Sequence, residues 1–486
     1  IIIDNYRIPR WGIIMEATEK SSFLRRVYPL DPREVTEEEL AVIFAMTSRR
    51  PEAFDEIKEM VTAEKAANFH ERWVLGYGHA SVAEHAIIHL AVENVSRLAC
   101  DTLEDNRIGS YTEKSSRYQL LERNAFYTPK ELDAFPETKL SYQVALQTMF
   151  DIYQQLVTGT IAYLATIHPQ HENERDRAYN LRLQREATDS CRFVLPASAL
   201  TNVGVTMNTR SLEHAVRKLL SSNLDEEQTL GEELKQQAKT ITPTLVRYAE
   251  RNNYLELSRS ALEEQTATLV PSMPIASPGP ASVSASLIDF DNKAQIRLVA
   301  ALLYRNAHAS YDDIWKHAIA LSTKQQEGVI VAALGSLGPH DSTVRELEQV
   351  EYTFEYLLDY GAYREFKRHR IQSYLPQPLT VVEGYVEPPL IRDSGLSSTY
   401  REAMEVSARA FTQLALISPR LAEYAVTHAH LRRVVTRMNL RECYHFFKLR
   451  VQPEAHFTIR DAAQQAMNLV HNVHPLLLKF INLRQG

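Results

Sequence analysis

Hydrophobic residues recur at three- and four-residue spacing along several stretches of the chain, a pattern typical of amphipathic helices. It predicts helices over 37–46, 55–75, 82–93, 213–220, 400–416 and 461–470. Thr36 and Glu39 form a predicted capping box at the start of the first helix. Runs rich in β-branched and aromatic residues predict strands over 23–28, 284–290 and 352–358. The sequence therefore predicts an α+β fold with a helical majority.

The same polar elements occur twice in the same order. A histidine element, an R-I-x-S-Y element and an M-N-x-R element begin at His79, Arg107 and Met207, and again at His340, Arg370 and Met438. The offset changes from 261 to 263 to 231 residues. A constant order with a changing offset indicates a repeat with insertions, and the period is far too long for a solenoid. About thirty extra residues are expected in the first copy, within 128–173.

The repeat predicts a domain organisation of two tandem copies. Copy one is expected over 1–265 and copy two over 287–486. The segment 266–286 between them is rich in Pro, Ser and Ala, which is typical of an extended linker. A chain of 486 residues is also too long for one ordinary core.

Composition excludes several classes of protein. Hydrophobic content of 44% and charged content of 24% are typical of a soluble globular protein. A net charge of −7 argues against nucleic-acid binding by the whole surface. No stretch of about 18 apolar residues predicts a membrane span, and the opening Ile1–Asp4 lacks the pattern of a signal peptide. Three widely separated cysteines fit reduced thiols in a cytoplasmic protein.

The segment 79–85, H-A-S-V-A-E-H, is the first polar cluster, and His89 follows it. His85 and His89 have the i, i+4 spacing of helical metal ligands, but no third ligand is evident. We therefore expect no metal here. The remaining interpretations are a partly buried polar helix start and a contact with a polar cofactor.

Two further segments carry groups that bind phosphate. The run 364–370, R-E-F-K-R-H-R, is either a solvated basic patch or a phosphate site, because arginine forks bind phosphates bidentately. Ser115, Ser116 and Arg117 form either an exposed loop or a phosphomonoester pocket. Each segment is degraded in the other copy. The two intact halves are therefore predicted to build one composite site.

These motifs together resemble the flavin-dependent thymidylate synthases. The shared order is H-x-S-x-x-E-H, then S-R, R-H-R-x-x-S, S-x-R-Y, R-x-x-L-P and N-x-R, with the parts divided between the copies. The resemblance implies that each copy folds as a small antiparallel sheet with helices. It also implies FAD as cofactor, and dUMP, methylenetetrahydrofolate and NADPH as partners in making dTMP. A family tetramer would correspond to two chains pairing as a homodimer, a pseudo-tetramer.

The resemblance assigns roles to individual residues. Its nucleotide-binding residues are Glu113, Ser115, Arg117, Arg192, Arg368 and Arg450, of which Arg368 and Arg450 are also expected to be catalytic. Its FAD-binding residues are His79, Ser81, Glu84, Asn208, Arg210, Arg368, His369, Arg370, Ile371, Asn439 and Arg441.

Departures from the family pattern keep alternatives open. Copy one has Asp105 at the start of its basic triplet and Leu219 at the position of the late arginine, and copy two has Leu375-Pro376 in its polar loop. Glu365 stands where the family has Gln, and a carboxylate there repels an anionic ligand. The alternatives are a flavin- or nucleotide-binding protein without turnover, and a related flavoenzyme acting on another pyrimidine nucleotide.

Overall fold

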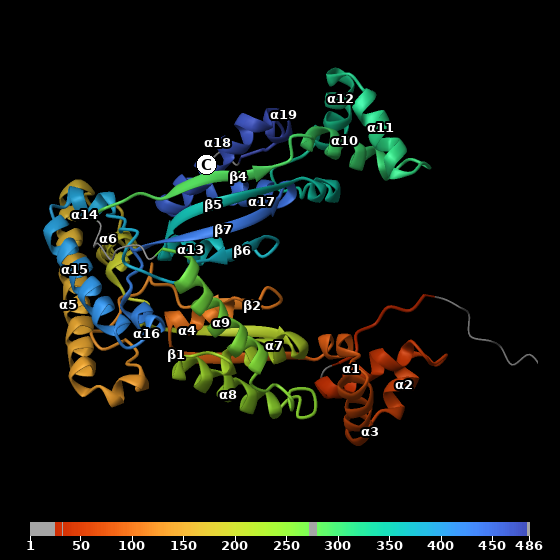
Figure 1. Cartoon of the computed structure of the whole chain (residues 1–486), viewed down its shortest axis with the longest axis horizontal. Helices are drawn as coiled ribbons and strands as arrows, with labels where there is room; N and C mark the ends of the chain where they lie inside the picture. The colour runs from red at the N-terminus through yellow and green to blue at the C-terminus, as the bar shows by residue number, and fades with distance from the viewer. Residues whose placement is uncertain (1–24, 32, 272–278, 484–486) are drawn as a thin grey trace, which may run out of the picture.

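The computed structural model describes residues 25–31, 33–271 and 279–483. Helices predominate, and the strands form two antiparallel sheets, β1-β3-β2 and β4-β5-β7-β6 (Figure 1). The predicted α+β fold with a helical majority and small antiparallel sheets is therefore confirmed. None of the described helices is both long enough and apolar enough to cross a membrane.

The first repeat contains the three-stranded sheet. Its strands are β1 (Ile87–Ser96), β2 (Ser110–Glu113) and β3 (Leu200–Asn208), with β3 in the centre. Helices α4 (Arg97–Glu104), α7 (Thr209–Leu220) and α8 (Asp225–Lys239) follow the strands. Alternate β3 residues, Val203, Val205 and Met207, pack in one hydrophobic cluster with Leu212 and Val216 of α7.

The second repeat places corresponding elements in the same order. Its strands are β4 (Ser284–Phe290), β5 (Glu351–Asp359), β6 (Ser373–Pro376) and β7 (Leu431–Asn439). Its helices α13 (Tyr360–Phe366), α17 (Leu440–Arg450) and α18 (Phe457–Val473) follow the strands as α4, α7 and α8 do. The strands predicted over 284–290 and 352–358 are confirmed. Residues 25–28 form no strand, and residues 23–24 lie outside the described part.

Each repeat also carries a cluster of helices that projects to the right in Figure 1. The first has α1 (Glu37–Thr47), α2 (Phe54–Met60), α3 (Ala63–Phe69) and the π-helical turn η1 (His70–Gly76). The second has α10 (Ala294–Tyr304), α11 (Tyr311–Ala320) and α12 (Thr323–Leu334). The capping box of Thr36 and Glu39 is confirmed. The helix predicted over 55–75 is interrupted because Thr62 caps a new helix, accepting a bond from Lys65 N.

One helix prediction is wrong, because residues 87–96 form strand β1 instead of the end of a helix over 82–93. Ile88 and Val92 face the hydrophobic core while their neighbours Ile87 and His89 are exposed, which is the two-residue period of a strand. The isoleucine and valine positions also fit helical spacing, so the apolar pattern alone was ambiguous. The hydrogen-bonded pairing of Ile87–Ser96 with β3 makes this segment a strand.

A bundle of helices at the left of Figure 1 joins the repeats. It contains α5 (Pro136–Ile167), α6 (Asp176–Cys191), α14 (Pro389–Asp393), α15 (Ser397–Ala415) and α16 (Pro419–Ala422). Helices α5 and α6 have 32 and 16 residues, whereas α15 and α16 have 19 and 4. The extra residues of the first repeat therefore lie in these two helices and extend beyond the predicted range 128–173.

The repeats meet about a pseudo-two-fold axis. Ala197 N donates to Val426 O (2.8 Å), and His428 N donates to Leu195 O (3.0 Å). These two bonds exchange under the 231-residue offset that relates Asn208 to Asn439. Two corresponding surfaces of the repeats therefore pack against each other within one chain. Helix α9 (Asn253–Leu269) extends into the predicted linker, and the short α19 (Pro475–Leu478) follows α18.

Candidate functional site

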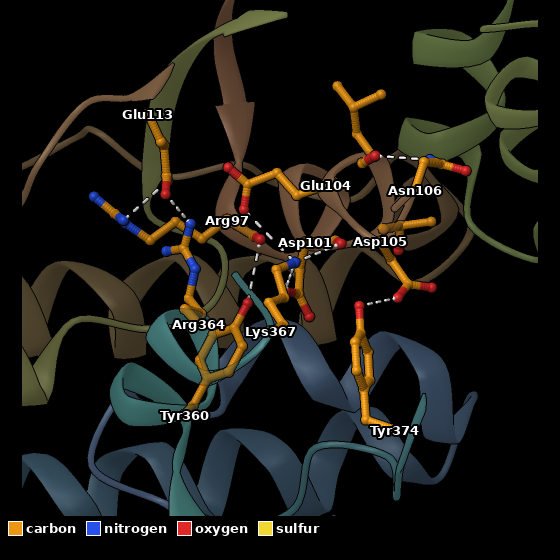
Figure 2. Close-up of polar contacts among 12 residues, drawn as sticks. Arg97, Asp101, Glu104, Asp105, Asn106, Glu113, Tyr360, Arg364, Lys367 and Tyr374 are labelled. Carbon is orange, nitrogen blue, oxygen red and sulfur yellow. Dashed lines mark hydrogen bonds and ion pairs between the residues drawn. The ribbon is translucent and has the colours of Figure 1, made fainter. Parts of the chain in front are cut away.

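The predicted loop residue Glu113 lies at the interface of the repeats, where α4 faces α13 (Figure 2). One of its carboxylate oxygens accepts from Arg97 (3.1 Å) and the other from Arg364, and all three side chains are buried. Burial favours the neutral acid, but the two guanidinium groups outweigh it and lower the pKa of Glu113 to about 2. Tyr360 and Lys367 add contacts to Arg97 O and Asp101 across the same interface.

Beside this interface lies a cluster of charges, the composite cluster, made of Arg117, Asp189 and Arg192 from the first repeat and Glu365 and Arg450 from the second. Arg117 Nε and Arg192 Nε lie 2.9 and 3.2 Å from Asp189 Oδ1. Arg450 Nη1 donates to Glu365 at 2.9 Å. Glu365 also acts electrostatically on Arg117 and Arg192. The structure thus brings cations of both repeats together, although each already has a carboxylate neighbour.

Burial and neighbouring charge compete in this cluster. Burial lowers the pKa of Arg117, but Asp189 more than offsets it, with a smaller contribution from Glu365, and the pKa is raised. Burial dominates at Arg192 and Arg450, and it lowers the pKa of both. The remaining loop residue, Ser115, accepts a bond from Arg117 N through its hydroxyl (3.3 Å). The serine hydroxyl therefore caps the backbone of its own loop.

The members of the basic triplet differ in their surroundings. His369 is buried and contacts Glu442 and Arg450, each at 3.0 Å. Arg370 donates to the backbone oxygens of Arg107 and Gly109 in the other repeat. Arg368 is exposed, and within the described residues its side chain makes no hydrogen bond or ion pair. It is close enough to Arg450 to lower the pKa of that group, so it adds a cation to the composite cluster.

The next residue, Ile371, lines a cavity of about 520 Å³ on the second repeat together with Arg441. His340, Ser342 and Lys448 also line this cavity. His340 and Ser342 are site candidates that the motif assignment omitted. The 261-residue offset from His79 and Ser81 was the signal that identifies them.

The corresponding first-repeat residues lie elsewhere. His79, Ser81 and Glu84 line a cavity of about 380 Å³ that contains no residue of the composite cluster. Glu84 pairs with Arg210, which lines a different cavity of about 510 Å³. These four predicted FAD-binding residues are therefore near one another but not brought to the cluster within one chain.

Two further predicted FAD-binding residues cap helices. The Oδ1 atoms of Asn208 and Asn439 accept from Ser211 N and Glu442 N, each at 2.8 Å. Each asparagine thereby ends a central strand and begins the helix after it. This turn explains why the M-N-x-R element occurs in both repeats. The Arg441 side chain, two residues after Asn439, is 39% exposed and pairs with Glu348 at 2.7 Å.

Comparison with known proteins agrees with this duplicated architecture. The profile of the Thy1 family, described as thymidylate synthase complementing protein, matches residues 33–244 and again 286–476. The chain belongs to the Thy1 family. It is 30% identical over 435 residues to a UPF0159 protein of Chlamydia pneumoniae (86% of this chain, 81% of the relative). It is 29% identical over 455 residues to a UPF0159 protein of Thermoplasma acidophilum (86% and 89%).

Shorter matches include named enzymes. A flavin-dependent thymidylate synthase of Thermococcus onnurineus is 29% identical over 167 residues, covering 34% of this chain and 56% of the relative. A solved UMP/dUMP methylase from Streptomyces cacaoi aligns with a TM-score of 0.35 and 15% identity, over 42% of this chain and 96% of that chain.

The pseudo-two-fold axis of the two Thy1 repeats places a counterpart of the composite cluster on the other side of the interface. A cavity of about 310 Å³ lies there. Six residues that line it occupy positions equivalent to residues at or near the composite cluster. They are Thr102 (for Glu365), Asp105 (for Arg368), Pro376 (for Glu113), Pro378 (for Ser115), Arg420 (for Asp189) and Glu423 (for Arg192).

The charges in this counterpart cavity are inverted. Arg420 stands for Asp189 and Glu423 for Arg192, and the two pair at 2.9 Å. Arg420 also donates to Glu227 at 3.1 Å. Proline replaces the serine of the polar loop. The two Thy1 repeats therefore form one cluster rich in arginine and one cavity whose charges neutralise each other.

The geometry of His85 and His89 does not support the interpretation that these two histidines are metal ligands on one helix. His85 ends a short helical turn and packs on the Phe44 ring, whereas His89 lies in β1 and contacts Thr206 Oγ1 at 2.9 Å. They are therefore not successive ligands on one helix. Cys100, Glu104 and Glu113 form the one described group with the proximity of a metal site. Both Glu113 oxygens, however, are already bound by arginines.

Proposed function

We propose that this protein is a thymidylate synthase-like flavoenzyme that converts dUMP to dTMP at a composite site between its Thy1 repeats. The reaction consumes dUMP, methylenetetrahydrofolate, NADPH and a proton, and yields dTMP, tetrahydrofolate and NADP⁺. The observation that carries the proposal is the composite cluster. Arg117 and Arg192 of one repeat pair with Asp189, and Glu365, which pairs with Arg450 of the other repeat, also acts on them electrostatically. Family membership and the thymidylate synthase relative support it.

The cluster has the charge that a nucleotide phosphate requires. Arg117, Arg192, Arg368 and Arg450 supply four positive charges, and Asp189 and Glu365 supply two negative ones. The resulting net charge of about +2 balances the negative charge of a phosphomonoester, which is about −2 at neutral pH. Arginine forks and the Ser115 hydroxyl are suitable donors to its oxygens. Binding of the phosphate requires Asp189 to share or release Arg117.

Arg450 is the cation proposed to act on the base. Reduction at uracil C6 develops negative charge on the ring carbonyl, and a fixed guanidinium beside that oxygen would stabilise it. Losing a preorganised donor of this kind typically costs roughly 2.7–4 kcal/mol in the barrier. Arg450 suits the role because Glu365 and His369 hold it in place. Arg368, exposed beside it, would contact the phosphate or the cofactor.

The 520 Å³ cavity is the proposed flavin site. His340, Ser342, Arg441 and Lys448 offer donors for a pyrophosphate, and Ile371 offers an apolar wall, so the residues fit a flavin nucleotide. Bound FAD would supply the hydride. Purified protein should therefore show flavin absorbance near 450 nm after incubation with FAD.

A homodimer is the proposed assembly. The cavity of His79, Ser81 and Glu84 shares no residue with the composite cluster, so it would serve such a site only across contact with a second chain. Sedimentation equilibrium should give twice the mass of 55.5 kDa. A monomer that turns over at full rate would remove this part of the proposal.

The decisive experiment follows the flavin anaerobically. FAD-loaded protein is reduced with NADPH, mixed with dUMP and methylenetetrahydrofolate, and the products are separated by chromatography. The proposal requires flavin reoxidation and dTMP in equal amounts. No flavin binding at all would remove every flavin-based function.

A second candidate function is binding without turnover, favoured by the carboxylates that already occupy the cluster. Asp189 engages Arg117 and Glu365 engages Arg450, which reduces their attraction for an anionic substrate. This candidate predicts that flavin and dUMP bind but no dTMP forms. If another pyrimidine nucleotide reoxidises the flavin where dUMP does not, the enzyme acts on that nucleotide instead.

A further inference from the structure

Arg450 is held in one orientation by three hydrogen bonds. Its Nε–H donates to His369 Nε2 at 3.0 Å, its Nη1–H to the Glu365 carboxylate at 2.9 Å, and its Nη2–H to the Glu365 carbonyl at 3.3 Å. The two bonds to Glu365 alone would let the guanidinium rotate about the line that joins their two nitrogens. The bond to His369 adds a third fixed atom, Nε, and thereby fixes the orientation of the guanidinium plane.

The bond from Arg450 requires one particular tautomer of His369. Arginine Nε always carries a hydrogen, so His369 Nε2 must present a lone pair. Burial, aided by Arg450 and His445, lowers the pKa of His369 well below its usual value, so the ring is neutral. A neutral imidazole with a lone pair on Nε2 carries its hydrogen on Nδ1.

A buried carboxyl group lies where that hydrogen points. Burial raises the pKa of Glu442 to about 7, and both its neutral and its ionised form carry an oxygen that can accept the bond. Glu442 Oε1 is 3.0 Å from His369 Nδ1, and both side chains are only 3% exposed. The donors therefore run in one direction, from Arg450 to His369 to Glu442. With the opposite tautomer, hydrogens on Arg450 and His369 would face each other.

We call the hydrogen-bonded series of Arg450, His369 and Glu442 the relay. The first repeat lacks every member of it. Under the repeat offsets, Leu219 stands for Arg450, Asn106 for His369 and Ser211 for Glu442. The relay therefore accompanies the arginine in the one repeat that has it. This comparison within the chain argues against a role in folding common to both repeats.

We propose that Glu442 is a positioning residue, which orients the Arg450 guanidinium by fixing the tautomer of His369. The role rests on the proposed function of Arg450. Glu442 also lines the 520 Å³ cavity proposed for the flavin, so a Kd for FAD that is unchanged in Glu442→Leu is required to show that its effect reaches the reaction through the histidine. A misplacement of about 1 Å in a catalytic group costs roughly 100-fold in rate. Since Glu365 still holds Arg450, we expect a loss of about tenfold or more.

The first test measures the tautomer directly in the full chain. Histidine is labelled with ¹⁵N, and the His369 signals are identified by their loss in His369→Gln. Wild type should show a protonated Nδ1 and an unprotonated Nε2 from pH 6 to 9. Glu442→Gln keeps an acceptor oxygen and should keep this tautomer, whereas Glu442→Leu should lose it. A protonated Nε2 in wild type, or an unchanged tautomer in Glu442→Leu, would overturn the proposal.

The second test separates positioning from folding in the FAD-loaded enzyme. Glu442→Leu should lower kcat about tenfold or more while the Kd of dUMP changes less than about threefold, and Glu442→Gln should restore the rate. Ser211→Ala, at the equivalent position, should leave both unchanged. Loss of rate in Glu442→Gln despite a wild-type tautomer would contradict the proposal. If wild type makes no dTMP, the proposed function fails, and the spectroscopic result still decides the relay.

Discussion

At the scale of single residues, two carboxylates set how strongly the composite cluster attracts an anion. Glu365 is the more informative, because its side chain is 13% exposed and lies among arginines of both repeats. Charges in such a partly enclosed site interact more strongly than on the open surface. Neutralising Glu365 should therefore change phosphate binding without moving any backbone.

We predict that Glu365→Gln binds dUMP about tenfold more tightly than wild type, as measured by isothermal titration calorimetry. The amide removes a negative charge next to the phosphate position while keeping an oxygen for Arg450. Glu355→Gln, which removes a half-buried carboxylate of β5 that pairs with Arg433 outside the composite cluster, is the matched control and should bind like wild type. Unchanged affinity in Glu365→Gln would place the phosphate away from this cluster.

A second residue-scale prediction concerns Glu226, which is buried between the repeats. It accepts bonds from Ser96 N, Ser96 Oγ and Tyr424 O–H. Burial nevertheless dominates and raises its pKa to about 7. The folded protein thus holds a proton up to about pH 7 that the unfolded chain releases near pH 4.5. Stability should fall by about 3 kcal/mol as the pH rises through this window.

Urea denaturation of wild type and Glu226→Gln at several pH values tests whether the free energy of unfolding falls as the pH rises. Glu226→Gln should remove the decline between pH 4.5 and 7, and it should be the more stable protein at pH 8. Glu263→Gln on the exposed helix α9 is the control and should keep the wild-type pH profile. Parallel profiles for wild type and Glu226→Gln would contradict the assignment.

The sequence contained much of the candidate site, because motif residues stay recognisable in a repeat. The loop of Ser115 and Arg117, and Arg450, follow from the motifs alone. Asp189 and Glu442 could not be predicted, since each acts through a partner distant in sequence. Likewise, helix capping by Asn208 depends on where β3 ends, and no local pattern identified that strand.

At the scale of elements, the pair α4 and α13 joins the repeats. Each helix begins at a buried N-cap, Ser96 or Asp359, related by the 263-residue offset. Opposite charges then meet between them, Lys367 at the end of α13 with Asp101 of α4, beside the pair of Arg364 and Glu113 (Figure 2). Such buried pairs specify one arrangement because a lone buried charge is costly.

We predict that Glu113→Gln destabilises the folded chain by about 3–5 kcal/mol, because it leaves two buried guanidinium groups without a counter-charge. The measurement is the free energy of unfolding in urea. Lys139→Met removes a cation from the exposed pair with Asp133 and should change stability by less than about 0.5 kcal/mol. If Glu113→Gln is as stable as wild type and loses only nucleotide binding, Glu113 is chiefly a ligand contact.

At this scale the sequence was less informative. Helices with long apolar patterns, such as α15 and α18, were predicted within a few residues. Strand β1 was not, because Ile88 and Val92 satisfy both a helical and a strand period. The choice depends on β3, more than a hundred residues further along the chain.

At the scale of the whole molecule, the two repeats have diverged in charge about one axis. On one side Asp189 lies between Arg117 and Arg192, and on the other Arg420 lies between Glu227 and Glu423. The second arrangement satisfies its own charges and offers no cationic surplus to a phosphate. Order along the chain predicted the duplication, and the repeat offset relates Arg420 to Asp189 and Glu423 to Arg192, but only the structure shows that each set of charges pairs internally.

The inversion predicts one nucleotide per chain, although each chain has two Thy1 repeats. Equilibrium dialysis with dUMP should give a stoichiometry near one. Arg117→Ala and Arg368→Ala should each abolish binding, since they supply the two halves of one site. Thr380→Ala, at the position equivalent to Arg117, should bind like wild type. Two equivalents bound, or loss of binding in only one of the two arginine variants, would show that the arginines of the two repeats do not act on the same phosphate.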